Sequence, residues 1–415
     1  MLWLLLLMVM IMPFEMSPYL YLSPSFLGVI PDFTVIKLLG MVGFAWALLK
    51  VLARESGPIF ESPQARLFVG FLIGIVISAS LNESAFTAIV KYTVFAFFMP
   101  IVLISVRTHQ DLRRIMYALG LTMVIVLPYA IRQTMRYAGP VGVGLYEPNY
   151  LASNLLLLIP IPLAISSYQD TLWKRLWWLA ASGLLVMGLF MTSSRGGFLG
   201  LLIATLVYVY RRRGFRAALA VFVLLILAVL PTDLGRRAGA TLDPDAPRPP
   251  GLEESNQAHT ALFWGGLKMM HDAPLFGVGP QRFKDYSRRY SGLKIPYIAH
   301  NTYLELASEG GLPVLLVFLL MFLSAIVVLG RAARLQGGAD ARELAAWAEA
   351  LRSGLIGFGV AGFFISAQFE KLFWVVMFLS IVVGRQAQLH AEASAEEPVA
   401  APARATPSRS PDPAY

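Results

Sequence analysis

The residues best suited to chemistry form the sequence His300-Asn301-Thr302-Tyr303-Leu304-Glu305, which closes a long polar stretch of the chain. An imidazole titrates near neutral pH, so His300 is suited to removing a proton from an attacking hydroxyl. Glu305 is near enough in sequence to orient or tune it, and Asn301 and Tyr303 add polar groups beside it. A histidine here also fits a helix cap or a hydrogen-bonded structural group, and the local sequence leaves both interpretations open.

A second candidate site surrounds Arg195 in the sequence Thr-Ser-Ser-Arg-Gly-Gly, between two very hydrophobic stretches. An arginine in such a place is costly unless it snorkels to the surface, pairs or binds an anion. Gly196 and Gly197 allow backbone amides to approach a ligand closely, and Ser194 adds a donor. The pattern predicts a phosphate-recognition cluster, with an interfacial anchor as the alternative.

A third motif lies inside the polar stretch, where residues 258–270 have helical spacing and an apolar face. This segment carries His259, Trp264 and Lys268, and it equally fits a structural helix lying along the membrane surface with Trp264 at the headgroup level. A basic, anion-attracting wall follows it at close spacing: Arg282, Lys284, Arg288 and Arg289. Gly277 and Gly279 do not form a nucleotide fingerprint, because no strand precedes them and a third glycine is missing.

The fourth motif is Tyr-Glu-Pro-Asn-Tyr-Leu-Ala-Ser at residues 146–153, in which Asn149 and Tyr150 are the candidate substrate contacts. Pro148 and Asn149 also fit an outer-surface turn that starts a helix. That alternative accounts for the motif by local rules alone.

Composition decides which elements must position these residues. Hydrophobic residues make up 57% of the 415-residue chain and charged residues 14%, which indicates an all-α, polytopic membrane protein. Long apolar runs must be helices, because a bilayer offers no water to unpaired backbone groups. We count about twelve such runs. They lie near residues 1–13, 34–52, 67–81, 85–106, 115–131, 150–168, 175–193, 197–210, 215–231, 311–330, 352–368 and 371–386.

Lys and Arg collect in alternate loops, which the positive-inside rule places in the cytoplasm. Both termini are then cytoplasmic, and the polar stretch and all four motifs face outward. We therefore predict four parts: membrane helices 1–9 (residues 1–231), a periplasmic loop domain with a surface helix (232–310), membrane helices 10–12 (311–386), and a disordered cytoplasmic tail (387–415).

The formal charge of +9 mostly reflects the membrane topology, because the Lys and Arg residues are spread over five short cytoplasmic loops. This argues against a nucleic-acid partner. The absence of cysteine excludes disulfides and thiolate metal sites. His259, His271 and His300 lack paired spacing, so we expect no metal and no cofactor.

The four motifs in this order resemble the O-antigen ligase and O-antigen polymerase superfamily over about residues 140–330. The resemblance implies a GT-C-like glycosyltransferase in the bacterial inner membrane, with a periplasmic active site and no nucleotide sugar or metal. Its members move an oligosaccharide from undecaprenyl pyrophosphate to an acceptor hydroxyl with inversion, on lipid A core for ligases or on a growing glycan for polymerases.

By this resemblance, Arg195 matches an arginine thought to hold the pyrophosphate, and His300 matches the proposed base. The family usually has another arginine about four residues before the tryptophan of the third motif. Here that position is Thr260, next to His259. Either His259 takes over its role, or an arginine further along the polar stretch supplies the charge, or this chain belongs to a branch with altered chemistry.

The alternative from another class is a small-anion transporter of the bicarbonate type, because some proteins with this motif set carry that label. A transporter needs charged residues inside its spans and a site near the midplane. The spans here are nearly charge-free, with Lys37, Lys91 and Glu370 at or near helix ends. The sequence also lacks the matched halves of many transporters.

Overall fold

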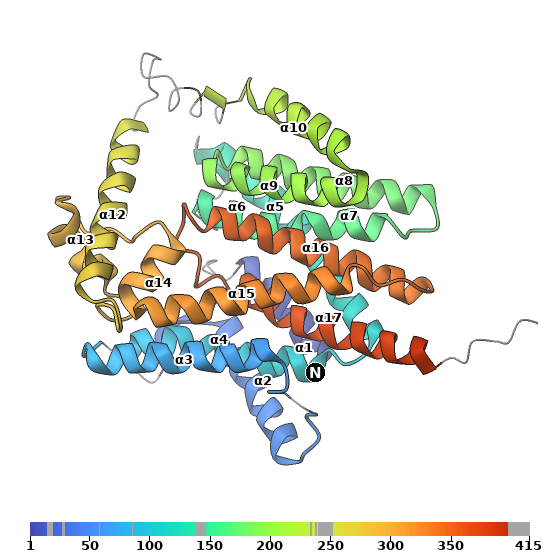
Figure 1. Ribbon diagram of the computed structural model, residues 1–415, viewed down its shortest axis with the longest axis horizontal. Coiled ribbons are helices and arrows are strands. Elements are labelled where there is room, and N and C mark those ends of the chain that lie inside the picture. The colour runs from blue at the N-terminus through green and yellow to red at the C-terminus, as the bar shows by residue number, and fades with distance from the viewer. Residues whose placement is uncertain are drawn as a thin grey trace, which may run out of the picture.

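The protein folds into a bundle of long helices that run side by side (Figure 1). The structure is a computed structural model, and it describes residues 1–14, 20–26, 30–57, 59–84, 86–137, 147–232, 235–236, 239 and 252–396. The helices before the polar stretch are α1 (Leu2–Ile11), η1 (Met12–Phe14), α2 (Val35–Leu52), α3 (Pro63–Leu81), α4 (Phe86–Ser105), α5 (His109–Tyr137), α6 (Pro148–Leu158), α7 (Pro160–Ser166), α8 (Leu172–Met191), α9 (Arg195–Arg213) and α10 (Phe215–Val229). The later helices are α12 (Leu252–Asp272), α13 (Phe283–Ser291), α14 (Thr302–Gly310), α15 (Leu312–Ala332), α16 (Ala339–Ala361) and α17 (Lys371–Glu396).

Seven stretches of helix in the described residues are long and apolar enough to cross a bilayer. They are Val35–Leu52, Pro63–Leu81, Ala88–Ser105, Pro148–Ser166, Leu172–Met191, Leu312–Ala332 and Lys371–Ala393, with shorter apolar helices at Leu2–Phe14 and Phe215–Val229. The predicted all-α, multi-pass membrane class is therefore confirmed. The number of twelve crossings stays a prediction, although α5, α9 and α16 overlap three more of the predicted runs.

Two boundaries differ from the sequence-based expectation. The predicted run 150–168 is divided at Ile159 into α6 and α7, because Pro160 lacks the N–H of a continuous helix. The predicted run 352–368 is wrong at its end: α16 stops at Ala361 and a turn-rich connection follows up to residue 370. Thr302 satisfies the backbone of this connection, since its N–H donates to Gly362 O at 2.8 Å and its hydroxyl donates to Ile365 O at 2.7 Å.

The sequence also did not predict a short antiparallel hairpin near the N-terminus. Strands β1 (Tyr21–Phe26) and β2 (Ile30–Thr34) pair as a two-stranded sheet, which is the only sheet in the described part of the chain. At the other terminus, α17 extends to Glu396 and so enters the segment predicted to be a disordered tail. The remainder of that segment, 397–415, lies outside the described residues.

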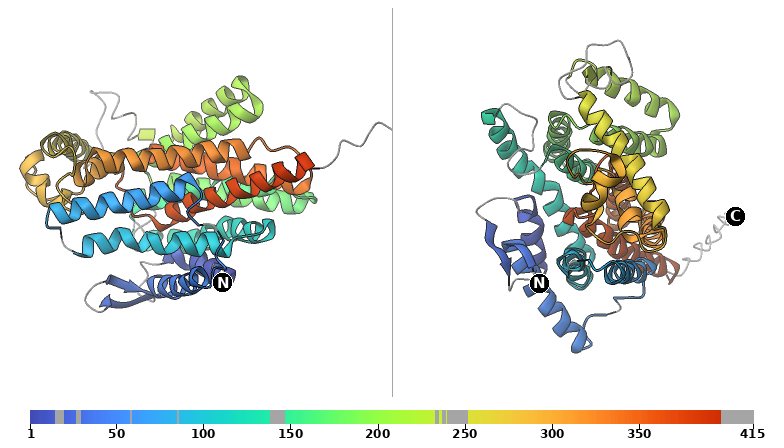
Figure 2. Two further views of the ribbon diagram at one scale, coloured as in Figure 1. Left: turned by 60° about the horizontal axis from the view of Figure 1, so that its bottom comes forward. Right: turned by 90° about the vertical axis from the view of Figure 1, so that its left-hand side faces the viewer.

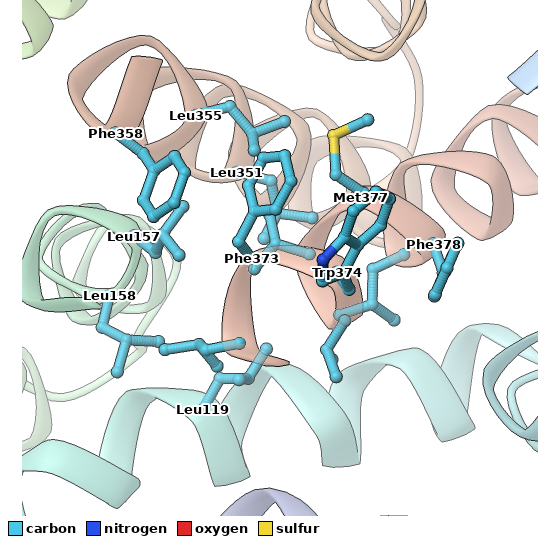
Figure 3. Close-up of a cluster of buried hydrophobic side chains, with 14 of the residues drawn as sticks. Leu119, Leu157, Leu158, Leu351, Leu355, Phe358, Phe373, Trp374, Met377 and Phe378 are labelled. Carbon is cyan, nitrogen blue, oxygen red and sulfur yellow. The ribbon is translucent and has the colours of Figure 1, made fainter. Parts of the chain in front are cut away.

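Aromatic side chains from several helices form the centre of the core. Trp374 of α17 is fully buried and lies 5.2 Å from Phe95 of α4 and 5.1 Å from Phe68 of α3, centroid to centroid. Phe373 stacks on Phe358 of α16 at 4.6 Å. Figure 3 shows this cluster, with leucines of α5, α6 and α16 closing around the rings. The N-terminal part of α17 is therefore fixed on several sides.

Helix α16 lies at the middle of the bundle, and glycines let α9 approach it closely. A Cβ atom on Gly200 would lie 2.5 Å from the carbonyl oxygen of Gly357. This distance is too short for any side chain, so glycine is required at residue 200 for the two helices to pack as they do.

Helices α12, α13 and α14 gather at one end of the bundle, on the left of Figure 1 and facing the viewer in the right-hand view of Figure 2. They have a small core of their own, formed by Leu262, Met269, Val278, Phe283 and Ala299. Helix α12 contains the surface helix predicted at 258–270. The polar stretch thus provides a folded cover at this end of the bundle.

Candidate active site

His300 lies in the turn that precedes α14, in a left-handed backbone conformation with φ 49°. Asn301 caps the helix: its side-chain oxygen accepts from the backbone N–H groups of Tyr303 at 3.1 Å and Leu304 at 3.0 Å. A non-glycine residue with positive φ is uncommon and persists where its neighbours hold it. The imidazole therefore projects from a turn whose C-terminal side is fixed by the cap.

The ring of His259, on α12, lies beside that of His300, with 5.1 Å between centroids and 59° between ring planes. Burial, with a smaller contribution from neighbouring His259, lowers the pKa of His300 to about 4. Burial and the positive charge of Arg195 likewise lower the pKa of His259. Both imidazoles are therefore neutral at physiological pH, which is the form of His300 that accepts a proton.

Arg195 is the first residue of α9 and is half-buried. Its Nη2 donates to the side-chain oxygen of Asn256 on α12 at 2.9 Å. Asn256 lies about one helical turn before His259, so the guanidinium and the two imidazoles belong to one polar cluster. We call Arg195, Asn256, His259 and His300 the Arg–His cluster.

The Ser194 and Asn149 side chains bond to each other and to the starts of two helices. Ser194 accepts from the Gly197 N–H at 3.1 Å and donates to the Asn149 side-chain oxygen at 2.7 Å. Asn149 also donates to Glu147, which caps α6 by accepting from the backbone N–H of Asn149 and of Tyr150. These bonds join the fourth motif to the second, and the Glu147 cap agrees with the alternative that the fourth motif starts a helix.

Glycines of the second motif serve close packing. A Cβ on Gly196 would lie 2.7 Å from Cβ of Phe364, and one on Gly197 would lie 2.6 Å from Cβ of Ala152. The Gly197 amide is already bonded to Ser194. The Gly197 amide therefore serves the start of α9, and the expectation that these two glycines bring amides to a ligand stays a prediction for Gly196.

Both tyrosines of the candidate set contact the end of α16 or the connection after it. The Tyr303 hydroxyl donates to Gly359 O at 2.6 Å, and the Tyr150 hydroxyl donates to Ser366 O at 3.4 Å. Glu305 is 4% exposed and also reaches this connection, where it binds Ser366 and Gln368. The sequence analysis missed Ser366, Gln368 and Asn256. For Ser366 and Gln368 a signal existed, since they are polar residues in an otherwise apolar run.

Four candidate basic residues of the polar stretch have other surroundings than the Arg–His cluster: Arg282, Arg288, Arg289 and Lys268. The guanidinium of Arg282 donates to Asn82 O, at the end of α3, and to the Tyr286 hydroxyl, and it lies 5.1 Å from the Tyr286 ring centroid. Arg289 lies over the ring of Tyr290, and Arg288 and Lys268 are exposed. Of the alternatives for the arginine expected near Thr260, His259 is the one that the structure brings beside His300. The exposed Thr260 hydroxyl donates to the Asn256 backbone oxygen.

A different group of titratable side chains lies at the other end of α16. Among the described residues, His109, Asp340 and Glu343 are the histidine and carboxylate groups whose ligand atoms lie close together, within 4.8 Å. Arg113 bonds to Glu343 at 2.9 Å and to Asp340 at 3.4 Å. A guanidinium thus already neutralises these carboxylates, which disfavours their use as a divalent cation site.

Residues 153–319 match the family described as O-antigen ligase. This match supports the predicted resemblance to the O-antigen ligase and polymerase superfamily. The matched segment of this O-antigen ligase domain contains every member of the Arg–His cluster, whereas Asn149 and the connection after α16 lie outside it. A search of the curated proteins finds no match. The match and the apolar helices together support a multi-pass membrane protein of the glycosyltransferase type, with lipid-linked glycans as substrates in general.

Proposed function

We propose that the protein transfers an oligosaccharide from undecaprenyl pyrophosphate to an acceptor hydroxyl on the periplasmic face of the inner membrane. The observation that carries the proposal is the Arg–His cluster, in which three separate segments bring one guanidinium and two neutral imidazoles together. A cation for the leaving group and a base for the nucleophile are what this reaction needs.

Arg195 holds the pyrophosphate of the donor. Its planar fork fits phosphate oxygens in bidentate fashion, and its charge stabilises the negative charge that develops as the glycosidic bond breaks. Its place at the first turn of α9 adds the partial positive charge of a helix N-terminus to the same region. His259 contributes a further hydrogen bond to the pyrophosphate, where the family usually has an arginine.

His300 removes the proton from the acceptor hydroxyl as the oxygen attacks the anomeric carbon. The attacking oxygen and the departing pyrophosphate lie on opposite faces of the sugar, so the configuration at that carbon inverts. The low pKa of His300 keeps the ring unprotonated and ready to accept at neutral pH. Charge neutralisation by arginine supplies the electrostatic part of the reaction without recourse to a metal or a nucleotide sugar.

The positions of the arginines at the helix ends support the placement of the site on the periplasmic face. All four motifs lie at the bundle end that carries α12 to α14. The last turn of α9 carries Arg211, Arg212 and Arg213, and the last turn of α15 carries Arg331; both turns lie at the opposite end. By the positive-inside rule that end is cytoplasmic. The predicted periplasmic loop domain 232–310 and the membrane parts 1–231 and 311–386 remain proposals on the same argument.

We take lipid A core as the acceptor, which makes the protein an O-antigen ligase. A polymerase of O-antigen or exopolysaccharide is the alternative within the superfamily. Glycan profiling of a deletion strain separates them: loss of all long chains from lipid A core indicates a ligase, and a single-repeat product indicates a polymerase. Solute uptake that depends on the protein, with unchanged surface glycan, would instead indicate the transporter.

The roles of the two principal residues are tested in the complemented deletion strain. His300→Ala should abolish transfer, and Arg195→Lys should fail as well, because lysine keeps the charge and loses the fork. His271→Ala and Arg175→Lys change exposed residues of the same types and serve as matched controls. Normal glycan transfer by His300→Ala, at wild-type protein level in the membrane, would contradict the assignment of the base.

A further inference from the structure

The carboxylate of Glu305 is buried one turn into α14 and receives hydrogen bonds from two separate parts of the chain. One oxygen accepts from the backbone N–H of Ala299 at 3.1 Å and from the Ser366 hydroxyl, and the other accepts from the Gln368 amide at 2.7 Å. Ala299 directly precedes His300, whereas Ser366 and Gln368 belong to the connection between α16 and α17.

This arrangement fixes the backbone on the N-terminal side of His300, as the Asn301 cap does on the other side. His300 adopts φ 49°, a conformation that costs energy for a residue with a side chain. Such a conformation persists when the surrounding contacts over-determine it. The Glu305 carboxylate supplies such a contact, because it bonds to Ala299, the residue directly before His300.

The far side of the arrangement is anchored in the core of the bundle. The indole N–H of Trp374 donates to the backbone oxygen of Gln368 at 2.9 Å, and Trp374 is packed among buried aromatic rings. Thr302 adds a second link, because its hydroxyl accepts from the Ala367 N–H at 2.9 Å. A rigid path therefore runs from the aromatic core through Gln368 and Glu305 to the turn that carries His300.

We propose that Glu305 is a positioning residue, whose carboxylate holds the His300 turn against the α16–α17 connection as a hydrogen-bond acceptor. The proposal rests on the proposed function for its effect on catalysis, but its effect on His300 itself is independent of any substrate. Glu305 does not touch the reacting atoms, and its charge is not what matters. The required property is an oxygen that accepts from Ala299 and Ser366.

The hydrogen-bond partners make this distinction testable. Burial raises the pKa of Glu305, while the three donors and the charge of Lys91 act in the opposite direction. A glutamine at 305 keeps an oxygen for Ala299 and Ser366, and its NH2 group then faces Gln368. The Gln368 side-chain oxygen has no hydrogen-bond partner among the described residues. A flip of the Gln368 amide would present that oxygen to the new NH2 group.

The experiment compares Glu305→Ala, Glu305→Gln and Glu309→Ala. Glu309 is the matched control, because it lies one turn further along α14, is 1% exposed and accepts from the Phe283 N–H at 3.0 Å. The pKa of His300 is measured by NMR on protein labelled at the histidine Cε1 position, with His300→Asn to assign its signal. Transfer is measured as kcat and KM per folded molecule.

We expect Glu305→Ala to lower kcat about a hundredfold with little change in KM, since a displacement of about 1 Å costs that much. The same variant should raise the pKa of His300 from about 4 toward its ordinary value, because the released turn exposes the ring. Glu305→Gln should restore both quantities. Glu309→Ala should lower the melting temperature and leave the pKa of His300 unchanged.

Three results would overturn the positioning role: an unchanged pKa of His300 in Glu305→Ala, an equal change in Glu309→Ala, or a Glu305→Gln variant as impaired as Glu305→Ala. The last result would mean that charge or proton transfer at Glu305 matters. If the wild-type protein transfers no glycan, the proposed function fails. The NMR comparison still decides whether Glu305 positions His300.

Discussion

Lowering the pH from 7.5 to 5.5 should leave kcat/KM for transfer almost unchanged, which is unusual for a reaction that depends on a histidine base. The reason is the burial of His300 beside His259, which lowers its pKa to about 4. A base must be unprotonated to act, so activity is present above the pKa and is lost as the pH falls through it.

The size of this pH effect follows from the difference between the pKa of His300 and that of an ordinary histidine. With a pKa of about 4, roughly 97% of His300 is neutral at pH 5.5, whereas with the ordinary histidine value of about 6.5 only about 9% would be. The burial of His300 thus makes about a tenfold difference in the active fraction at this pH. The midpoint of the acidic limb should lie about 2.5 pH units below that of an exposed histidine.

The assay is transfer from a purified lipid-linked donor by the detergent-solubilised protein, with kcat/KM measured from pH 4 to 8. The acidic limb of the kcat/KM profile reports the pKa of the base in the free protein. The acidic limb of the kcat profile reports its pKa in the protein with donor bound. A bound pyrophosphate brings negative charge near the imidazoles and raises their pKa, so the limb in kcat should lie at the higher pH of the two.

Size-exclusion chromatography at each pH provides the control for unfolding. A loss of kcat/KM between pH 7 and 6, with the protein still folded, would refute the argument. In that case either His300 is exposed in solution or another group with an ordinary pKa acts as the base.

Two further predictions concern packing and the second histidine. Gly200→Ala should destabilise the bundle by about 1–3 kcal/mol through overpacking, because the new Cβ meets a backbone oxygen at 2.5 Å. Gly183→Ala is the control, since nothing lies within 4 Å of its Cβ, and a Gly200→Ala melting temperature no lower than that of Gly183→Ala would contradict the close approach. His259→Ala should reduce transfer about tenfold or more, the value of one hydrogen bond to a charged group. Thr260→Ala should not do so, because its hydroxyl bonds within its own helix; equal losses in both variants would argue against a role for His259.

The sequence predicted the class of the fold and the end of the bundle at which the motifs meet. Both follow from local composition: apolar runs must be helices in a bilayer, and basic loops fix their direction. A helix does start at Pro148, as one interpretation of the fourth motif predicted, but the caps are Glu147 there and Asn301 at α14, where the sequence had suggested His300.

The connection between α16 and α17 was not predictable in the same way. Ser366 and Gln368 interrupt its apolar run, but they do not reveal where the helix ends. The backbone leaves the helix where Thr302 supplies alternative hydrogen bonds from about sixty positions earlier in the chain. Arg282 shows the same limit. Its charge suggested an anion site, but its guanidinium is oriented by a backbone oxygen of Asn82, a contact that no local pattern reveals.

The charge balance of the Arg–His cluster leads to a last prediction. A pyrophosphate diester brings about two negative charges to a site in which Arg195 supplies one positive charge, and burial keeps both imidazoles neutral in the free protein. Binding should therefore raise the pKa of His259 and draw a proton onto it. Linkage then requires that affinity for the glycan-linked undecaprenyl pyrophosphate donor rise as the pH falls through the raised pKa of the bound state toward the lower pKa of the free protein.

This proton uptake is measurable by calorimetry of binding of the glycan-linked donor, whose pyrophosphate diester does not itself titrate near neutral pH, in buffers of different ionisation enthalpy. His259→Arg is the informative variant, because a guanidinium at that position supplies the second charge permanently. We expect it to bind the lipid with similar or higher affinity but without taking up the proton at neutral pH. If the wild-type protein binds the lipid without proton uptake, then His259 does not stand in for an arginine, and the second charge on the donor must be neutralised from elsewhere in the polar stretch.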